Sequence, residues 1–275
     1  MKSNEGETRP GVADGAVAGA QTVERALLVL DVLAGSRAGL RLSDLSQAMG
    51  LNISTTSRVL GALDRFGYVR REAETGRYRL GYRLLQLSQA VLEQSPLPEM
   101  ANPVLARLMA ETGETATLCI RQDDQAIVIA RVECANPLRS VAQIGHAGPL
   151  YCTGHGKAML AHLPEEETMQ ILGLGMPRLT ERTITDPARM EEELAQIRSR
   201  GYAVDTGERD PELVSVVAPV WDAAGRVAAT CGISGSSQRI RADVVPGLAA
   251  TVTAATAVIS ERLGGRMPEG VMDGG

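Results

Sequence analysis

Two short helical segments on either side of a glycine constrain the fold of this chain more than any other feature. Residues 43–49 have apolar residues at helical spacing, with Ser43 placed as the N-cap, and Gly50 follows where helices often end in the left-handed conformation. Ser54 is then placed to cap a further helix over residues 54–66. Two helices joined by a tight turn that contains a glycine are typical of a helix-turn-helix.

The flanking residues extend this unit to a winged helix. An apolar stripe at helical spacing predicts a first helix over residues 22–34, with Thr22 as its N-cap. Residues 68–71 and 77–80 predict the two strands of a hairpin. Leucines at helical spacing then predict a linker helix, which ends before the Ser-Pro-Leu-Pro sequence at residues 95–98. That sequence is the clearest domain boundary in the chain.

The rest of the chain alternates helices and strands. Hairpin turns separate several of the strands, which favours a mixed α/β domain over a Rossmann fold. Asp186 before Pro187 predicts a helix start, because Asp is a good N-cap and proline is tolerated at the first helical position. The expected helices are residues 102–112, opened by Asn102 and Pro103, and residues 156–163, 165–172, 186–200 and 241–263. The expected strands are residues 117–120, 126–132, 202–205, 214–220 and 227–234.

Composition excludes several classes of protein. The four cysteines are scattered with no CxxC pair, which predicts buried or free thiols rather than a disulfide framework or a zinc site. No apolar run is long enough for a transmembrane helix and no secretory signal is apparent, so a cytoplasmic protein without membrane association is expected. Residues 21–85 carry a net charge of +4 and residues 86–275 carry −8. This asymmetry fits a nucleic-acid-binding module joined to a sensor or enzyme domain.

Several stretches, in order along the chain, resemble the IclR family of bacterial transcriptional regulators. In the N-terminal part they are residues 21–27 (QTVERAL), 51–60 (LNISTTSRVL) and 66–84 (FGYVRREAETGRYRLGYRL). Further on they are residues 149–160 (PLYCTGHGKAML), 183–187 (TITDP), 200–205 (RGYAVD) and 215–222 (SVVAPVWD). The resemblance covers residues 21–264. It implies a winged helix-turn-helix domain and a GAF-like effector-binding domain, assembled as a homodimer or a dimer of dimers, without enzymatic activity.

The expected fold class is therefore multi-domain α/β. Residues 1–20 are rich in glycine, alanine and small polar residues without periodicity, which predicts a disordered tail. The expected segments are that tail, a winged helix-turn-helix DNA-binding domain over residues 21–81, a linker helix over residues 82–96, an effector-binding domain over residues 97–264 and a flexible tail over residues 265–275.

The second helix of the helix-turn-helix begins with short hydroxyl side chains followed by an arginine. Arg58 is the first candidate for a base contact, because a guanidinium can bind guanine through two hydrogen bonds. Ser54 and Thr55 are placed to bind phosphate at the helix N-terminus, although Ser54 as a simple cap is the alternative. Arg77 is expected at the tip of the wing. The candidate DNA-binding residues are Arg25, Arg41, Ser54, Thr55, Thr56, Ser57, Arg58 and Arg77.

A glycine-rich turn at residues 154–156 suits a carboxylate ligand. Glycines let backbone amides approach an anion, and the helix N-terminus that follows favours negative charge. The family resemblance implies a pocket lined by this loop, an Asp and serines, and Gly232 stands at one of the serine positions. The missing hydroxyl suggests added room and a larger acid, aromatic or sugar-derived. The candidate effector-binding residues are Gly154, His155, Asp205, Leu213, Ser215, Gly232 and Ser234, with Val141 and Leu150 as further apolar walls.

Other interpretations of this region stay open. His155 could contact a carboxylate, bind a metal with Cys152 and Asp205, or pack without a ligand. Lys157 could bind a ligand or belong to the packing of its helix. Because no nucleophile, base and orienting group occur together at an informative spacing, no catalytic residue, metal or cofactor is assigned.

These observations favour a ligand-responsive transcriptional regulator of a catabolic operon. It would bind a double-stranded DNA operator, act as a repressor with activation as the alternative, and sense a small organic acid. The competing hypothesis is an enzyme that turns over the acid in its C-terminal domain with His155, Lys157 or Cys152. A purely structural DNA-binding protein is a third hypothesis, which the size of the second domain disfavours.

Overall fold

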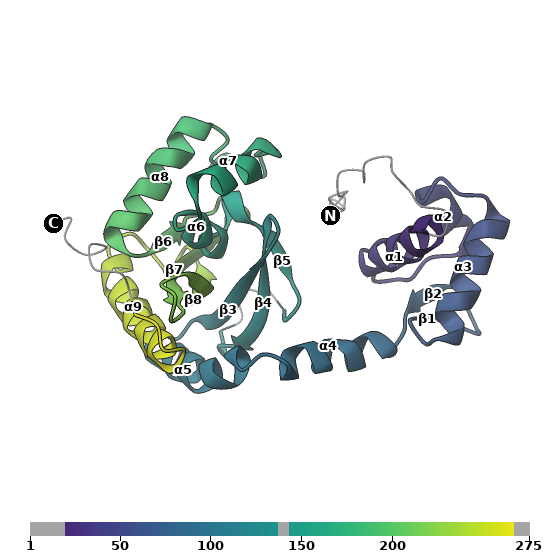
Figure 1. Cartoon of the computed structure of the whole chain (residues 1–275), viewed down its shortest axis with the longest axis horizontal. Coiled ribbons are helices and arrows are strands. Elements are labelled where there is room, and N and C mark those ends of the chain that lie inside the picture. Colours follow the sequence, from purple (N-terminus) through teal and green to yellow (C-terminus); the bar gives the residue numbers. More distant parts are fainter. Residues whose placement is uncertain (1–19, 137–142, 267–275) are drawn as a thin grey trace. The chain divides into compact units, whose positions relative to one another are not determined.

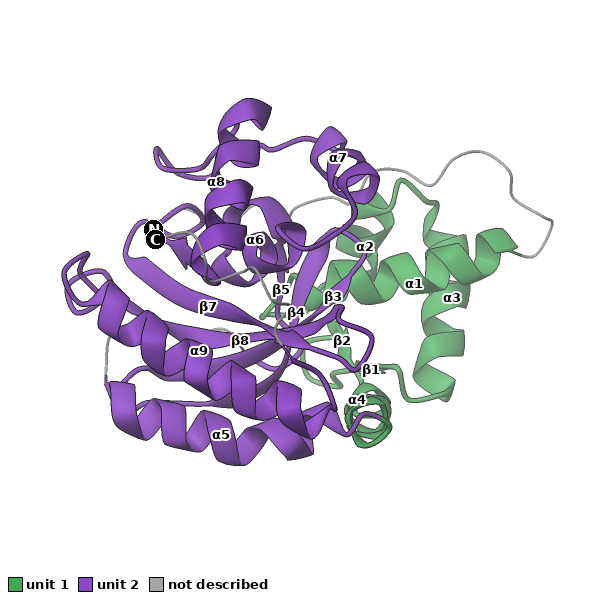
Figure 2. Ribbon diagram, turned by 60° about the vertical axis from the view of Figure 1, so that its left-hand side comes forward, with its two compact units in different colours: residues 1–94 green, residues 95–275 purple. Residues whose placement is uncertain are grey.

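The chain folds into two compact units. A computed structural model describes residues 20–136 and 143–266, and the described chain divides between Gln94 and Ser95 (Figure 2). Most of the tails expected at the two ends, and Val141, lie outside these residues. None of the helices in the described ranges has the length and apolar content needed to cross a bilayer.

Unit 1 is a winged helix followed by a further helix (Figure 1). Its elements are α1 (Ala20–Ala34), α2 (Leu42–Ala48), α3 (Ile53–Arg65), β1 (Val69–Arg71), β2 (Tyr78–Leu80) and α4 (Arg83–Glu93). β1 and β2 pair as an antiparallel hairpin. The core is formed by Val29, Leu33, Leu45, Val59, Leu60 and Val69. Because these side chains come from α1, α2, α3 and β1, burying them fixes the helix-turn-helix geometry.

The helix starts of unit 1 differ from the expected N-caps. α1 begins at Ala20, so Thr22 lies inside the helix. The backbone N–H of Arg41 donates to the carboxylate of Asp44 at 3.2 Å and Arg41 is the N-cap of α2, not Ser43. The side chain of Asn52 accepts from the N–H of Thr55 at 2.8 Å, which makes Asn52 the N-cap of α3 and leaves Ser54 inside it. Asparagine caps as well as serine does, so the spacing alone could not choose between them.

Unit 2 is built on one antiparallel sheet of six strands. The strands are β3 (Thr115–Gln122), β4 (Gln125–Val132), β5 (Ala147–Pro149), β6 (Ala203–Asp205), β7 (Leu213–Trp221) and β8 (Val227–Ser236). Their order in the sheet is β5-β4-β3-β8-β7-β6, and every neighbouring pair is antiparallel. This arrangement confirms the mixed α/β fold class and excludes a parallel Rossmann sheet.

Helices cover both faces of this sheet (Figure 2). α5 (Leu97–Thr112) and α9 (Val245–Arg262) lie along one face, while η1 (Leu150–Cys152), α6 (Gly154–Leu160), α7 (Glu165–Gly173) and α8 (Pro187–Arg200) lie on the other. α5 starts at Leu97, five residues before the expected Asn102, and keeps Pro103 inside the helix. Asp186 caps α8 as expected, since its carboxylate accepts from the N–H of Arg189 at 2.9 Å.

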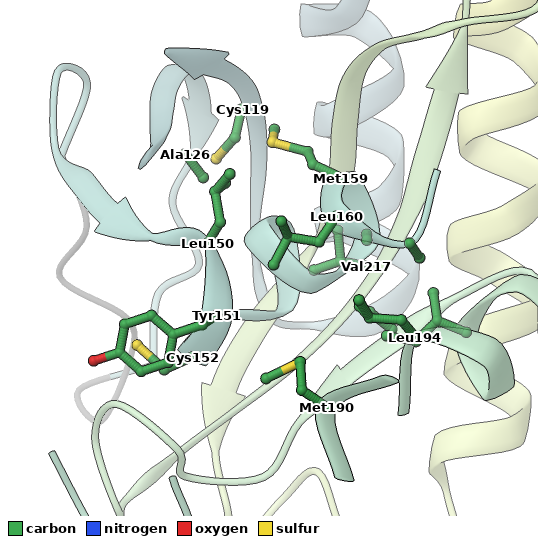
Figure 3. Close-up of a cluster of buried hydrophobic side chains, with 14 of the residues drawn as sticks. Cys119, Ala126, Leu150, Tyr151, Cys152, Met159, Leu160, Met190, Leu194 and Val217 are labelled. Carbon is green, nitrogen blue, oxygen red and sulfur yellow. The ribbon is translucent and has the colours of Figure 1, made fainter. Parts of the chain in front are cut away.

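One cluster of buried core residues lies between α6, α8 and the sheet (Figure 3). Leu150, Leu160, Met190 and Ile197 are among its fully buried side chains. All four cysteines are buried and free, the state that their spacing predicted. Among the described residues, no three His, Cys, Asp or Glu side chains gather where they could hold a metal ion.

Candidate DNA-binding surface and effector site

The start of α3 presents part of the expected hydroxyl cluster to solvent. Ser54, Ser57 and Arg58 are exposed and Thr55 is half-buried. Thr56 is fully buried, and its hydroxyl donates to the carbonyl of Asn52 at 3.1 Å. The prediction that Thr56 contacts DNA is therefore wrong, because the residue lies one helical turn before Val59 and Leu60 on the inward face.

The far end of α3 also differs from the prediction. Phe66 stands at the end of the helix expected over residues 54–66, but it lies outside α3 and is 63% exposed. The helix ends at Arg65, so Phe66 no longer follows helical spacing, and the Arg65 guanidinium lies 5.1 Å from its ring centre. The sequence offered one signal for this helix end, the glycine directly after Phe66. Glycine often takes a positive φ just after a helix, and Gly67 does so here.

Two arginines of the wing are bound to the turn between α1 and α2. Arg77 donates to the carbonyl of Gly39 at 2.8 Å, and Arg79 donates to the carbonyl of Arg37 at 2.6 Å. Arg79 also forms an ion pair with Glu72. Arg77 is therefore half-buried and held against the turn between α1 and α2 rather than free. These contacts position the wing against the helices.

The exposed arginines of the wing lie on β1. Arg70 and Arg71 are both exposed, and their guanidiniums lie 5.2 and 5.8 Å from the ring centres of Tyr82 and Tyr78. Stacking on a ring restricts a long side chain without neutralising its charge. Of the remaining candidates, Arg41 is exposed and Arg25 is half-buried. The positive surface of unit 1 thus includes Arg70 and Arg71, which were not among the candidate DNA-binding residues.

In unit 2, three of the expected effector-binding residues form one row across the sheet. Asp205 of β6 pairs with Ser215 of β7, and Ser215 pairs with Ser234 of β8. Directly paired residues of antiparallel strands project to the same face. Gly154 at the start of α6 lies over this row, because a Cβ built on it would stand 2.3 Å from Oγ of Ser215. The structure therefore brings these four residues together.

Two candidates stand at the margins of this row. Leu213 is half-buried at the first position of β7, on the same face as Ser215. Gly232 pairs with Val217, and a Cβ on Gly232 would lie 2.3 Å from the carbonyl oxygen of Val216. The expectation that glycine adds room for a larger acid is therefore wrong, since the neighbouring backbone already fills the space of a serine.

His155 is fully engaged within the protein. Its Nε2 lies 2.8 Å from Oγ1 of Thr117 and its Nδ1 lies 2.9 Å from Oγ1 of Thr230. Burial lowers the pKa of His155 to about 4, so the ring is neutral near pH 7. A neutral imidazole with both nitrogens hydrogen-bonded fastens α6 to β3 and β8 and is not free to bind a metal or a carboxylate. Only its backbone amide stays available to a ligand.

Asp205 organises the loop that follows β6. One carboxylate oxygen accepts from the N–H of Gly207 at 3.0 Å and from the N–H of Glu208 at 2.8 Å. Burial raises the pKa of Asp205, and the amide of Glu208 and the charge of Lys157 oppose that rise. The residue is therefore both a member of the row and the anchor of the β6–β7 loop.

Lys157 is only 1% exposed and lies at the centre of a buried ion cluster. Its ammonium forms an ion pair with Glu208, donates to the carbonyl of Val204 at 2.9 Å and lies 3.4 Å from the carboxylate of Glu193. Burial raises the pKa of Glu208 to about 7, against the opposing charge of Lys157. Sequence reasoning missed Glu208, because no pattern links it to a lysine that lies in another element.

The three residues of the competing enzyme hypothesis are buried and engaged within unit 2. Cys152 is fully buried, and burial raises the pKa of its thiol to about 12, so the nucleophilic thiolate is suppressed. Lys157 is held by carboxylates and the His155 ring by threonines.

Comparison with known proteins agrees with this architecture. Residues 22–73 match the profile described as IclR helix-turn-helix domain, and residues 89–261 match bacterial transcriptional regulator IclR C-terminal. The chain is 36% identical over 223 residues to the HTH-type transcriptional regulator BhcR of Paracoccus denitrificans, a match that covers 81% of this chain and 80% of that protein. It is 33% identical over 261 residues to the transcriptional repressor IclR of Escherichia coli, covering 94% and 95% of the two chains.

The fold of a solved relative is also similar. The crystal structure of the Thermotoga maritima IclR aligns with a TM-score of 0.71 at 28% identity, over 89% of this chain and 99% of that one. These relatives are transcriptional regulators rather than enzymes. With an N-terminal helix-turn-helix DNA-binding domain and a C-terminal α/β domain that both match, this chain belongs to the IclR family of bacterial transcriptional regulators.

Proposed function

We propose that this protein represses a catabolic operon by binding a double-stranded DNA operator through α3 and the wing, and that a small organic acid bound by unit 2 modulates this binding. The observation that carries the DNA-binding part is the division of α3 into two faces. Val59 and Leu60 are buried in the core, while Ser54, Ser57 and Arg58 are exposed. The name of the Escherichia coli relative supports repression rather than activation. Acting on operator DNA places the protein in the bacterial cytoplasm.

Within this proposal the exposed residues have separate roles. Arg58 reads a base edge, because it stands about one helical turn into α3 and a guanidinium can discriminate guanine by ~1–3 kcal/mol. Ser54 and Ser57 contact phosphates. Arg70 and Arg71 extend the interface along the wing. Removing Arg58 should therefore reduce operator specificity more than overall affinity for DNA.

A mobility-shift titration on the protein's own upstream DNA, at fixed salt, tests this part of the proposal. Arg58→Ala should weaken operator binding about tenfold or more while leaving binding to scrambled DNA nearly unchanged. Arg107→Ala is the matched control, because Arg107 is an exposed arginine of α5 paired with Glu111. Equal binding of operator and scrambled DNA by the unmodified protein would contradict the proposed role.

The effector part rests on the row of Asp205, Ser215 and Ser234 beneath Gly154. The two serine hydroxyls form no hydrogen bond to any other residue in the described ranges, so they are available to a polar ligand. The proposed class is a small organic acid, and Gly232 gives no ground for restricting it to larger acids. The same titration repeated with benzoate, gluconate and pyruvate should show one acid that changes operator affinity.

We also propose that the protein acts as a homodimer or dimer of dimers. Apolar side chains are exposed on α1 and α4: Val23, Leu27, Leu28, Leu85 and Val91 are each more than half exposed. Paired winged helices would read two half-sites of the operator. Sedimentation velocity of the full chain checks the assembly, and a monomer at micromolar concentration would contradict it.

A further inference from the structure

We infer that Arg209 binds the carboxylate of the effector and thereby selects acids over neutral ligands of the same shape. This inference rests on the proposed effector-binding function of unit 2. It adds a residue that lies outside the row of Asp205, Ser215 and Ser234, and it assigns the charged end of the ligand to the β6–β7 loop.

The first support is the direction in which Arg209 extends. It belongs to the loop between β6 and β7, and its Nη1 donates to the carbonyl of Ala147 on β5 at 3.2 Å. Gly148 leaves room for this approach, since a Cβ on Gly148 would lie 2.6 Å from the same nitrogen. The side chain is half-buried. The guanidinium therefore reaches from the loop that follows Asp205 to the edge strand β5 beside η1.

The second support is the surroundings of the guanidinium. Burial and the charge of Arg209 lower the pKa of His146. Burial raises the pKa of Cys152 and of Asp205, and the charge of Arg209 opposes both rises. These effects place the cation beside the row and beside the loop that leads into α6, without a direct bond to either.

The third support is that Arg209 lacks a counter-ion. Across residues 20–136 and 143–266, no carboxylate lies within ion-pair distance of it, and its one hydrogen bond uses one of five N–H donors. Two other cations of this region are neutralised: Lys157 pairs with Glu208 and Arg200 with Glu193. A half-buried guanidinium with unused donors is suited to a carboxylate, which it can hold through two charge-assisted hydrogen bonds.

Asp205 cannot take that role itself. One of its carboxylate oxygens already accepts hydrogen bonds from the amides of Gly207 and Glu208, and its negative charge would repel a carboxylate placed against it. A ligand whose carboxylate meets Arg209 can instead direct a hydroxyl or carbonyl group toward Asp205, Ser215 and Ser234. The ligand class is therefore a small carboxylic acid with a second polar group or ring.

The test compares each acid with its primary amide, which keeps the shape and removes the charge. Benzoate and benzamide, gluconate and gluconamide, and pyruvate and pyruvamide are titrated into the full-length protein by calorimetry. For the acid that binds, we expect affinity about tenfold or more above that of its amide, and Arg209→Gln should abolish this preference. Arg182→Gln is the matched control, because Arg182 is exposed and donates to the carbonyl of Thr206 on the same loop at 2.7 Å.

Operator binding and melting temperature, measured on each variant, show that the fold is intact. An acid preference that survives in Arg209→Gln, or that Arg182→Gln also loses, would overturn the inference. Absence of binding by all three acids would overturn it as well. In either case, operator binding by the unmodified protein would still support the proposed DNA-binding function. Failure of the Arg209 inference can therefore be distinguished from failure of that function.

Discussion

The buried carboxyl of Glu208 should make the stability of unit 2 depend on pH in a predictable direction. Burial raises its pKa to about 7 from 4.5, so the folded state holds the proton more tightly than the unfolded chain does. The stabilisation is fully present below pH 4.5 and is lost as the pH rises through 7. A difference of about 2.5 pH units at ~1.36 kcal/mol per unit corresponds to ~3 kcal/mol.

The variant Glu208→Gln isolates this effect, because the amide does not titrate. Two histidines, the buried His155 and the half-buried His162, change stability in the opposite direction, because burial lowers the pKa of each to about 4. Their contribution is present above pH 6.5 and is lost as the pH falls through 4. Both proteins carry these histidines, so their contribution cancels when the unfolding free energy of the variant is subtracted from that of the unmodified protein. This difference should fall by ~3 kcal/mol between pH 4.5 and 8.

Urea unfolding followed by tryptophan fluorescence measures the difference. Trp221 is the only tryptophan in the chain and is buried at the end of β7, so it reports on unit 2. Glu111→Gln is the control, since it removes an exposed carboxylate whose ion pair with Arg107 solvent screens. A difference between the unmodified protein and Glu208→Gln that stays constant across this pH range would refute the argument from burial.

Three further substitutions test local features of the structure. Asn52→Ala removes the N-cap of α3 and should cost ~1 kcal/mol of stability and weaken operator binding, measured by thermal melting and mobility shift. His155→Leu leaves two buried threonine hydroxyls without their partner and should lower the urea unfolding free energy by ~2–5 kcal/mol; an unchanged value would contradict its fastening role. Gly232→Ser should lower the melting temperature because its Cβ would meet the Val216 carbonyl at 2.3 Å, whereas Gly173→Ser, with nothing within 4 Å, should be tolerated.

Periodicity and turn residues predicted most of the secondary structure. The strands around residues 122–125 and the cap of α8 at Asp186 are found as expected, because these signals lie within a few neighbouring residues. The errors occur where two local signals compete. Asn52 caps α3 in place of Ser54, and Thr56 faces inward because it lies one helical turn before Val59 and Leu60.

The candidate effector site could be predicted only in part. The family resemblance named Asp205, Ser215 and Ser234, and the strand register places them side by side. It also named Gly232 as a source of space, which the closeness of the β7 backbone excludes. The distance between two strands at one residue depends on the twist and packing of the whole sheet, and no motif encodes it.

Short-range pattern was enough to determine which segments are helices or strands, that an N-terminal helix-turn-helix is present, and which domain carries the basic charge. The hydrogen-bond and ion-pair partners of the buried polar groups, and their pKa shifts, depended on the tertiary structure. Lys157 meets Glu208 across 51 residues, and His155 meets Thr230 across 75. Desolvation and ion pairing depend on which distant segments exclude water from a group. For this reason His155 and Lys157, which suggested chemistry in the sequence, are held by partners from distant segments. Arg209, which no sequence pattern singled out, uses one of its five N–H donors within the described residues.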